Sequence, residues 1–315
     1  MKRAFVFPGQ GSQSVGMGKA LAENFPQARA VFDEVDDALS QKLSGLMWEG
    51  PADELTLTAN AQPALMAVSL AAMRVLEAEA GLDLKTQAAF VAGHSLGEYS
   101  ALAAAGSLSV ADTARLLRIR GNAMQSAVPV GQGAMAALLG LEYDVALEVA
   151  REAAQGEVCD AANDNGGAQV VVSGHKAAVE RAVAIAQGKG AKRAVMLNVS
   201  APFHSALMAP AAEAMREALA KVTVNAPAVP LVANVTAAPV TEPDAIRDGL
   251  VRQVTGTVRW RESVAFMAAQ GVESFVEVGS GKVLTGLVKR IAPGAPGTAV
   301  GTPEDVAAFT ASLKG

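Results

Sequence analysis

Short apolar runs alternate with longer stretches of helical periodicity along the chain. The runs predict β-strands, because each is only a few residues long. They cover residues 4–7, 88–92, 133–141, 157–162, 168–173, 193–199, 229–235 and 274–278. The periodic stretches predict helices at residues 20–39, 63–79, 99–105, 111–125, 143–154, 176–188, 206–221, 247–254, 261–270 and 282–291. Strands that alternate with helices favour the α/β class with a mostly parallel sheet.

The middle of the chain follows a different order. From residue 131 to residue 200 the predicted elements run β-α-β-β-α-β, which is the order of a ferredoxin-like fold. Gly131 and Pro202 mark the points where this segment begins and ends. We therefore expect a large α/β domain made of residues 1–130 and 201–315, with a small ferredoxin-like subdomain, residues 131–200, inserted between its two segments.

The composition excludes several classes of protein. Of the 315 residues, 51% are hydrophobic and 18% are charged, so the chain is not of the disordered type. Its formal net charge of −5 does not provide the basic surface that nucleic acid requires. Cys159 is the only cysteine, which excludes an internal disulfide and favours a reducing compartment. Three histidines and one cysteine, without a metal-site spacing motif, predict no metal centre.

Neither a signal peptide nor a membrane span is predicted. The first apolar run ends at Pro8, short of the about 7–15 apolar residues of a signal peptide. The longest apolar helical stretch, residues 64–76, contains Arg74 and is shorter than the about 20 residues that a span needs. We therefore expect a cytoplasmic protein without a membrane partner.

The segment Gly93-His94-Ser95-Leu96-Gly97 lies between a predicted strand and a predicted helix. This is the context of a nucleophile elbow, in which a tight turn exposes the serine hydroxyl and flanking glycines allow close backbone approach. The helix start that follows offers N–H donors and a positive dipole end to a developing oxyanion. An ordinary strand–helix turn rich in small residues is the alternative.

A serine nucleophile needs a base, and histidine is the commonest one. His94 is adjacent to Ser95, and neighbours in an extended segment point in opposite directions. His175 fits a surface turn. His204 lies at the predicted start of a helix, where the dipole disfavours the imidazolium and helps to keep the ring neutral. No acidic residue is an obvious third member, so a backbone carbonyl is a candidate for orienting the histidine.

Arg120 is predicted to face the protein interior. Its neighbours one helical turn away are Leu116, Leu117, Ala123 and Met124, whereas Arg118 has more polar neighbours. A buried guanidinium without a partner is costly. Either a distant acid pairs with Arg120, or its partner is an anionic group of the substrate, since a guanidinium matches a carboxylate in a bidentate pair.

Two other glycine-rich segments do not indicate a nucleotide cofactor. Residues 9–14 lack the third glycine of the dinucleotide-binding motif. Residues 276–283 lack both the first glycine and the Ser/Thr of a P-loop.

Six segments together resemble one known family. They are FVFPGQGSQ, GHSLGEYSAL, the pair Arg120-Gly121, NDN…QVVVSGH, SAPFHS and EVGSGKVLTGL. In this order, along essentially the whole chain, they resemble the malonyl-CoA:acyl carrier protein transacylases of bacterial type II fatty acid synthesis. The acyltransferase domains of polyketide synthases share these motifs. The resemblance implies an α/β-hydrolase-like core with a ferredoxin-like insert, which agrees with the pattern of elements.

The resemblance also implies catalytic roles. Ser95 is similar to the serine that carries the malonyl ester, and His204 to its base. Gln253 resembles the glutamine whose backbone carbonyl orients that histidine. Gln10 and Leu96 would supply the N–H groups of the oxyanion hole.

Four further residues match positions around the family's substrate. Arg120 resembles the arginine that binds the malonyl carboxylate. Gln62 and Asn163 match positions near the pocket. Phe203, directly before the histidine, is similar to the residue of malonyl-selective members, and its bulk would crowd an extra methyl group on the malonyl α-carbon.

The implied reaction passes malonyl from CoA to Ser95 and then to the pantetheine thiol of an acyl carrier protein, without a metal or redox cofactor. The enzyme is expected to be a monomer, with a local basic patch for an acidic carrier. Candidates for the patch are Lys189, Lys192, Arg193, Lys282, Lys289 and Arg290. Three alternatives are a discrete acyltransferase of a polyketide synthase, a serine acyl hydrolase, and a non-catalytic scaffold. Retention of all the site residues disfavours the scaffold, and the lack of a triad acid disfavours a lipase.

Overall fold

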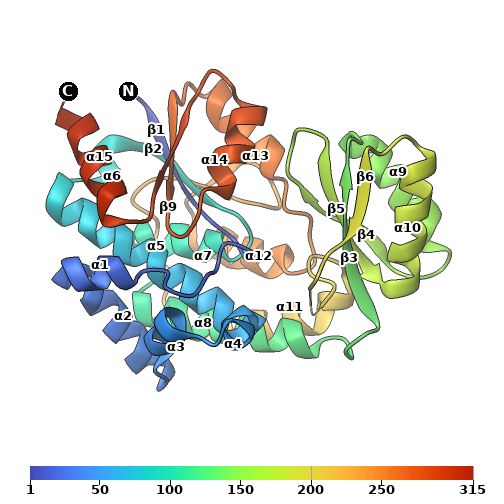
Figure 1. Cartoon of the computed structure of the whole chain (residues 1–315), viewed down its shortest axis with the longest axis horizontal. Coiled ribbons are helices and arrows are strands. Elements are labelled where there is room, and N and C mark those ends of the chain that lie inside the picture. Colours follow the sequence, from blue (N-terminus) through green and yellow to red (C-terminus); the bar gives the residue numbers. More distant parts are fainter. Residues whose placement is uncertain (200, 315) are drawn as a thin grey trace.

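Two β-sheets organise the computed structural model, which describes residues 1–199 and 201–314 (Figure 1). The larger sheet consists of β1 (Arg3–Phe7), β2 (Ala88–Gly93), β7 (Leu231–Val232), β8 (Pro239–Val240), β9 (Ser274–Val278) and β10 (Gly297–Val300). Its strand order is β10-β9-β1-β2-β7-β8, and every pair is parallel except β7 with β8. The predicted α/β class with a mostly parallel sheet is therefore confirmed.

Alternate residues of the central strand β1 enter two different apolar clusters. Phe5 and Phe7 pack into the cluster that contains the long helices α2 (Pro26–Leu39), α5 (Thr58–Ala80) and α8 (Val110–Ser126). Ala4 and Val6 pack on the other face, against α13 (Trp260–Ala269) and α14 (Val283–Ile291). Successive side chains of a strand point to opposite faces, so an uninterrupted apolar run fits a strand that is covered by helices on both faces.

The remaining helices of this part are shorter or lie at its edges. They are α1 (Lys19–Asn24), α3 (Leu43–Glu49), α4 (Ala52–Thr56), α6 (Leu84–Gln87), α7 (Gly97–Ala104), the 3₁₀ turn η1 (Ala206–Met208), α11 (Ala209–Leu219), α12 (Pro243–Gln253) and α15 (Pro303–Lys314). In Figure 1 the two ends of the chain lie close to each other. Among the helices in residues 1–199 and 201–314, none is long and apolar enough to cross a membrane.

The second sheet has four strands and its own apolar core. It consists of β3 (Gly133–Leu139), β4 (Cys159–Asp164), β5 (Gln169–His175) and β6 (Arg193–Met196), in the order β4-β5-β3-β6 with every pair antiparallel. Helices α9 (Tyr143–Ala154) and α10 (Lys176–Gly188) cover one face of it (Figure 1). The order β-α-β-β-α-β along the chain is the one that the sequence predicts, and both helices have their predicted bounds.

Prolines account for two differences from the predicted elements. The single helix expected over residues 20–39 is two helices, because α2 begins anew with Pro26 at its first position, which favours a helix start. The helix expected to begin at Pro63 instead begins at Thr58, so this proline lies inside α5. The extra turn carries Gln62, whose side chain is buried and bonded to Arg120.

The strand expected to end at residue 162 continues through Asn163 and Asp164, which are the last residues of β4. They are held there by the segment before α13, since Asp164 N–H donates to Val258 O at 3.0 Å and Val258 N–H donates to Ala162 O at 2.8 Å. The same two residues also pair with Val171 and Val170 of β5, so contacts on both sides keep the end of β4 extended. The local sequence does not reveal these tertiary contacts.

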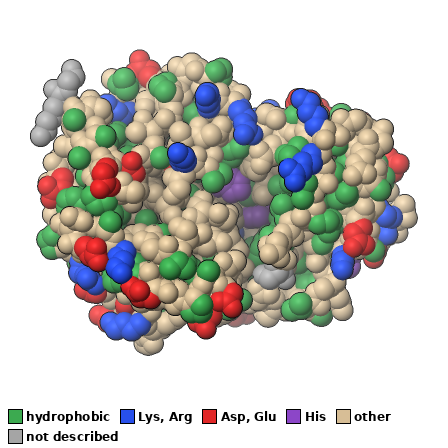
Figure 2. All heavy atoms as spheres, viewed as in Figure 1, with side chains coloured by type: hydrophobic (Ala, Val, Ile, Leu, Met, Phe, Trp, Pro, Cys, Tyr) green, Lys and Arg blue, Asp and Glu red, His purple; other side chains and the backbone are tan. Residues whose placement is uncertain are grey.

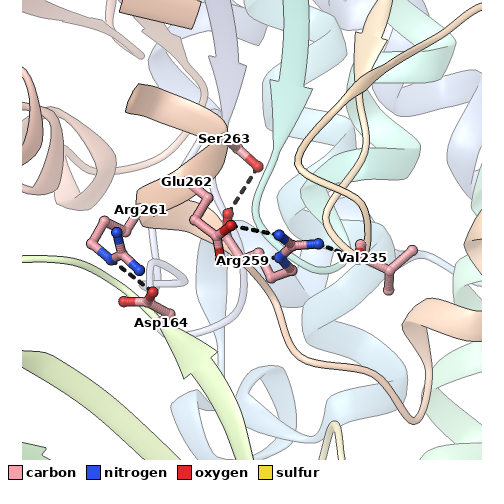
Figure 3. Close-up of polar contacts among 6 residues, drawn as sticks. All are labelled: Asp164, Val235, Arg259, Arg261, Glu262 and Ser263. Carbon is pink, nitrogen blue, oxygen red and sulfur yellow. Dashed lines mark hydrogen bonds and ion pairs between the residues drawn. The ribbon is translucent and has the colours of Figure 1, made fainter. Parts of the chain in front are cut away.

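An ion pair reinforces the same junction, as Figure 3 shows. The Arg261 Nε lies 2.8 Å from Asp164 Oδ2, and the side chain of Asp164 is almost completely buried. On the side of the large part, Arg259 forms an ion pair with Glu262 and donates to the Val235 carbonyl at 3.3 Å, which holds the start of α13 in place. The junction therefore fixes the small sheet against the part of the molecule that contains the large sheet.

Candidate active site

A sharp turn between β2 and α7 carries Ser95. The residue has a φ of +53°, a left-handed conformation that is uncommon for residues other than glycine. The flanking glycines are required by close backbone contacts. A Cβ atom added to Gly93 would lie 1.9 Å from Gly97 O, and one added to Gly97 would lie 2.2 Å from Phe7 O. The predicted strand–turn–helix context of Ser95 is thus present, with the geometry of a nucleophile elbow.

His204 lies against the serine hydroxyl. Its Nε2 is 2.7 Å from Ser95 Oγ, and its Nδ1 is 2.9 Å from Gln253 O and 3.1 Å from Gly256 O. Carbonyl oxygens only accept hydrogen bonds, so Nδ1 carries the proton and Nε2 is left as the acceptor for the serine proton. Backbone carbonyls occupy the place of the acid in a Ser-His-Asp triad.

The environment of His204 strongly favours the neutral ring. Burial, with a further contribution from the positive charge of Arg120, lowers the pKa of His204 to about 3. From the sequence, a helix start was expected to keep the ring neutral. In the structure His204 has a φ of +55° and precedes the 3₁₀ turn Ala206–Met208, so it does not lie in the first turn of an α-helix. Desolvation is the larger cause, and the sequence alone could not reveal the depth of burial.

Arg120 is buried as predicted and converges on the same serine. Its side chain is 1% exposed, and its Nη2 donates to Ser95 Oγ at 3.1 Å. Amide oxygens hold the guanidinium from two sides, with Nη1 donating to Gln62 Oε1 and Nη2 to Gln253 Oε1, both at 2.8 Å. Among the carboxylates of residues 1–199 and 201–314, none forms an ion pair with it. Glu98 acts on it only at longer range.

The other candidate residues surround one cavity of about 330 Å³. Gln10, Gln62, Asn163, Phe203 and His204 all line it, together with Ser95 and Arg120. The Oδ1 atom of Asn163 is buried and has no hydrogen-bond partner within the described ranges. Figure 2 shows histidine side chains at the bottom of the hollow between the two parts of the molecule.

Leu96 lies beside this cavity, at the start of α7. It is the N-cap residue of that helix and its side chain is buried. Backbone N–H groups at a helix start have no acceptor within the helix and can bind an anion.

The other two histidines have different surroundings. His94 also lines the cavity, but its Nε2 lies 2.8 Å from Asn165 Oδ1 and its ring packs near Trp260. His175 accepts a hydrogen bond from Val158 N–H at 2.9 Å within the small sheet. Neither contacts the Ser95 hydroxyl, so His204 is the histidine placed to act on it.

Two buried residues near the serine were not singled out from the sequence. Glu98 is 1% exposed, and burial raises its pKa to about 7. Its Oε2 accepts the N–H of Asn234 at 2.7 Å, and the Asn234 side chain bonds to the backbone of the elbow. Glu98 belongs to the GHSLGE segment and could have been noticed there. Asn234 lies far away in sequence, in no motif, and only the fold reveals it.

A serine hydroxyl bonded to a neutral, oriented imidazole defines the class of enzymes that transfer acyl groups through an acyl-serine. The chain belongs to the family described as acyl transferase domain, which matches residues 4–302. It is 50% identical over 305 residues to the malonyl CoA-acyl carrier protein transacylase of Escherichia coli (strain K12), covering 97% of each chain.

Solved structures agree with this assignment. The acyl-carrier-protein S-malonyltransferase of Bartonella henselae superimposes with a TM-score of 0.97 at 59% identity, covering 100% of both chains. A malonyl-transacylase solved in complex with a type II PKS acyl-carrier protein has a TM-score of 0.95 at 42% identity, covering 99% of this chain and 100% of its own.

Proposed function

We propose that this chain transfers a malonyl group from malonyl-CoA to the pantetheine thiol of an acyl carrier protein, through a malonyl ester of Ser95. One observation carries the choice of malonyl. Arg120 is a buried cation without an ion-pair partner among the described residues, 3.1 Å from the serine hydroxyl. An acyl group that ends in a carboxylate supplies the missing anion. The names of the relatives support the same substrate.

The first half-reaction forms the ester. His204 Nε2 takes the proton of Ser95 Oγ as that oxygen attacks the thioester carbonyl carbon. The tetrahedral intermediate collapses, the C–S bond breaks, and the CoA sulfur leaves with the proton from the imidazolium. The backbone N–H groups of Gln10 and Leu96 are proposed to stabilise the oxyanion of this intermediate.

The second half-reaction follows the same path in reverse. The pantetheine thiol enters the cavity and His204 takes its proton, so that the sulfur attacks the malonyl ester carbonyl. The Ser95 oxygen leaves and recovers its proton, and the malonyl thioester of the carrier departs. Every step uses side chains and backbone groups of this chain, and no cofactor takes part in the proposal.

Four residues are proposed to shape specificity. Arg120 binds the malonyl carboxylate, and Gln62 holds the guanidinium in place through its Oε1 atom. Asn163 offers an acceptor to substrate N–H groups, because its Oδ1 is unpaired within the described part of the chain. Phe203 lines the cavity and crowds an extra methyl group on the α-carbon. Discrimination by one methyl group is worth only about 1–3 kcal/mol, so selection against methylmalonyl is finite.

Two versions of this function differ in the pathway that the acyl carrier protein serves. Fatty acid synthesis is the main proposal. A relative in complex with a type II PKS carrier makes a polyketide synthase the second candidate. A serine acyl hydrolase differs from both in passing malonyl to water. These functions are tested by incubating the enzyme with malonyl-CoA and the holo form of either carrier. Malonyl transfer that exceeds malonate release supports a transferase, and the preferred carrier assigns the pathway.

The two parts of the molecule are proposed to be an α/β-hydrolase-like core and a ferredoxin-like insert. An α/β-hydrolase-like core, residues 1–130 and 201–315, is supported by the nucleophile elbow at the carboxyl end of β2. A ferredoxin-like subdomain, residues 131–200, is supported by its separate apolar core. The proposed boundary at Ser200 lies outside the described residues. A monomeric state and a cytoplasmic location complete the proposal, the latter supported by the single cysteine.

The pH dependence of the first half-reaction tests the state of His204. A base with the ordinary histidine pKa of about 6.5 would lose about 90% of its neutral form at pH 5.5. Burial lowers the pKa of His204 to about 3, so the neutral form persists throughout this range. We expect no tenfold fall in the rate of malonyl-Ser95 formation between pH 7.5 and 5.5. Glu98, whose pKa burial raises to about 7, is the group near the serine that titrates within this range. A tenfold fall with a midpoint near pH 6.5, measured by rapid quench, would contradict this assignment.

Basic residues beside the hollow are proposed to bind the carrier. Lys and Arg side chains gather over α14 and over the facing part of the small sheet (Figure 2). Lys282, Lys289, Arg290, Lys192 and Arg193 are exposed. Lys189 is a weaker candidate, because it lies 3.2 Å from Glu152 and 3.7 Å from Glu148, which offset its charge.

Charge reversal at Lys289 and Arg290 tests the patch. The double variant Lys289→Glu/Arg290→Glu is expected to raise the KM for the carrier about tenfold, since rim charges steer association. The rate of malonyl-Ser95 formation from malonyl-CoA should not change. Lys85→Glu, at an exposed lysine on α6, which lies on the side of the large part away from the small sheet (Figure 1), is the matched control. An unchanged carrier KM in the double variant removes these two residues from the interface.

A further inference from the structure

We propose that Asn234 is the positioning residue of the nucleophile, because its side-chain amide replaces a neighbouring strand at the turn that carries Ser95. The inference rests on the proposed function and adds to it the residue that holds the serine in its reactive conformation.

The hydrogen bonds of the elbow show this replacement. Strand β7 pairs with β2 in parallel at Val91 and Leu231 but consists of only two residues. Beyond it, Asn234 Oδ1 accepts the N–H of Ser95 at 2.8 Å, and Asn234 Nδ2 donates to Gly93 O at 2.7 Å. In a parallel sheet, a residue of the neighbouring strand donates its backbone N–H to the C=O of one residue. Its own C=O accepts the N–H of the residue two positions later. The Asn234 amide occupies the place of those peptide groups.

Asn234 is itself held rigidly. It is completely buried, and its backbone N–H donates to Glu98 Oε2 at 2.7 Å. Its Oδ1 also lies 3.3 Å from Gln253 Nε2, which donates to Ser95 O at 2.9 Å. Two side-chain amides thus bind the two backbone polar groups of the serine.

This support is needed because Ser95 is in an unfavourable conformation. A φ of +53° persists in a serine only where the surroundings determine it. The conformation directs Oγ to His204 Nε2 and to Arg120 Nη2. Without the Asn234 amide, Ser95 N–H and Gly93 O lose their partner inside the protein, and the turn can relax away from His204.

Asn234 does not line the substrate cavity, so its loss should affect kcat rather than KM. We expect Asn234→Ala to reduce kcat for malonyl transfer about 10- to 100-fold, with the KM for malonyl-CoA changed less than about threefold. Val232→Ala, a buried truncation in β7, is the matched control. It should lower the melting temperature and leave kcat within about twofold of wild type.

The Asn234→Asp variant separates positioning from a general loss of stability. An ionised aspartate accepts from Ser95 N–H but faces Gly93 O without a donor, whereas the protonated acid restores the donor. We expect the kcat of this variant, relative to wild type at the same pH, to rise about tenfold from pH 8 to pH 5.5. The ratio for Asn234→Ala should stay flat. Glu98 accepts the backbone N–H of residue 234, so in Asn234→Asp the two carboxyls titrate as a coupled pair. Titration of Glu98 without that partner is common to wild type and Asn234→Ala, which is why the ratio for Asn234→Ala is the reference.

The outcomes are decisive in either direction. A kcat of Asn234→Ala within twofold of wild type overturns the inference. If that variant does not fold, a flat pH ratio for Asn234→Asp overturns it and a rising ratio supports it. Failure of the proposed function is recognised separately, because wild type itself would then not transfer malonyl to the carrier.

Discussion

Replacing Arg120 by alanine is expected to lower kcat/KM for malonyl-CoA by about 10²- to 10³-fold, the usual consequence of removing one partner of a buried charge pair. Transfer of acetyl, which has no carboxylate, should change less than about threefold. The reason is that the guanidinium has amide partners and the serine hydroxyl around it, and only the substrate brings an anion. The measurement is kcat/KM for both thioesters in the wild type and the variant.

Arg118 provides the matched control for this prediction. It lies on the same helix but is only half-buried, and it bonds to the side chains of Asn60 and Gln41. Arg118→Ala removes the same chemical group without touching the cavity, so both kcat/KM values should stay within about twofold of wild type. Equal losses with malonyl and acetyl in Arg120→Ala would mean that Arg120 supports the fold of the site and does not bind the carboxylate.

Replacing His204 by alanine is expected to reduce kcat by about 10³-fold or more, because general-base catalysis contributes up to about 10⁴-fold. Without the imidazole, Ser95 Oγ keeps Arg120 as a neighbour but has no acceptor 2.7 Å away to take its proton. Single-turnover rates of malonyl-Ser95 formation measure this step directly.

The matched control is His175→Ala, which removes an imidazole of the small sheet that accepts a hydrogen bond from the Val158 N–H. Its rate should lie within about twofold of wild type. A His204→Ala variant that retained more than a tenth of the wild-type rate would exclude this histidine as the base.

The pattern of apolar positions predicted the strands and helices whose burial is set by their own sequence. Strand β1 is apolar from Ala4 to Phe7 because helices cover both faces there, and helices α9 and α10 have their predicted bounds. The pattern failed where tertiary contact decides. The last two residues of β4 are polar, yet pairing with β5 on one side and with Val258 on the other keeps them extended. The short helices α3 and α4 and the last strand β10 have too few residues for a periodic signal.

The residues of the site also include some that the sequence predicts and one that it does not. Ser95 was predictable, since glycine spacing reports a local backbone demand that Gly93 and Gly97 satisfy. The inward position of Arg120 followed from helical periodicity and is confirmed by its burial. Asn234 could not be found, because its partners are backbone atoms of the elbow about 140 residues earlier in the chain. A side chain that bonds to backbone leaves no complementary residue for sequence reasoning to detect.

The formation of malonyl-Ser95 is the central claim, and the intact mass of the protein after brief incubation with malonyl-CoA tests it most directly. We expect one malonyl adduct on wild type, none on Ser95→Ala, and rapid loss of the adduct when holo acyl carrier protein is added. An adduct that persists on Ser95→Ala, or one lost equally fast in water without the carrier, would contradict the account.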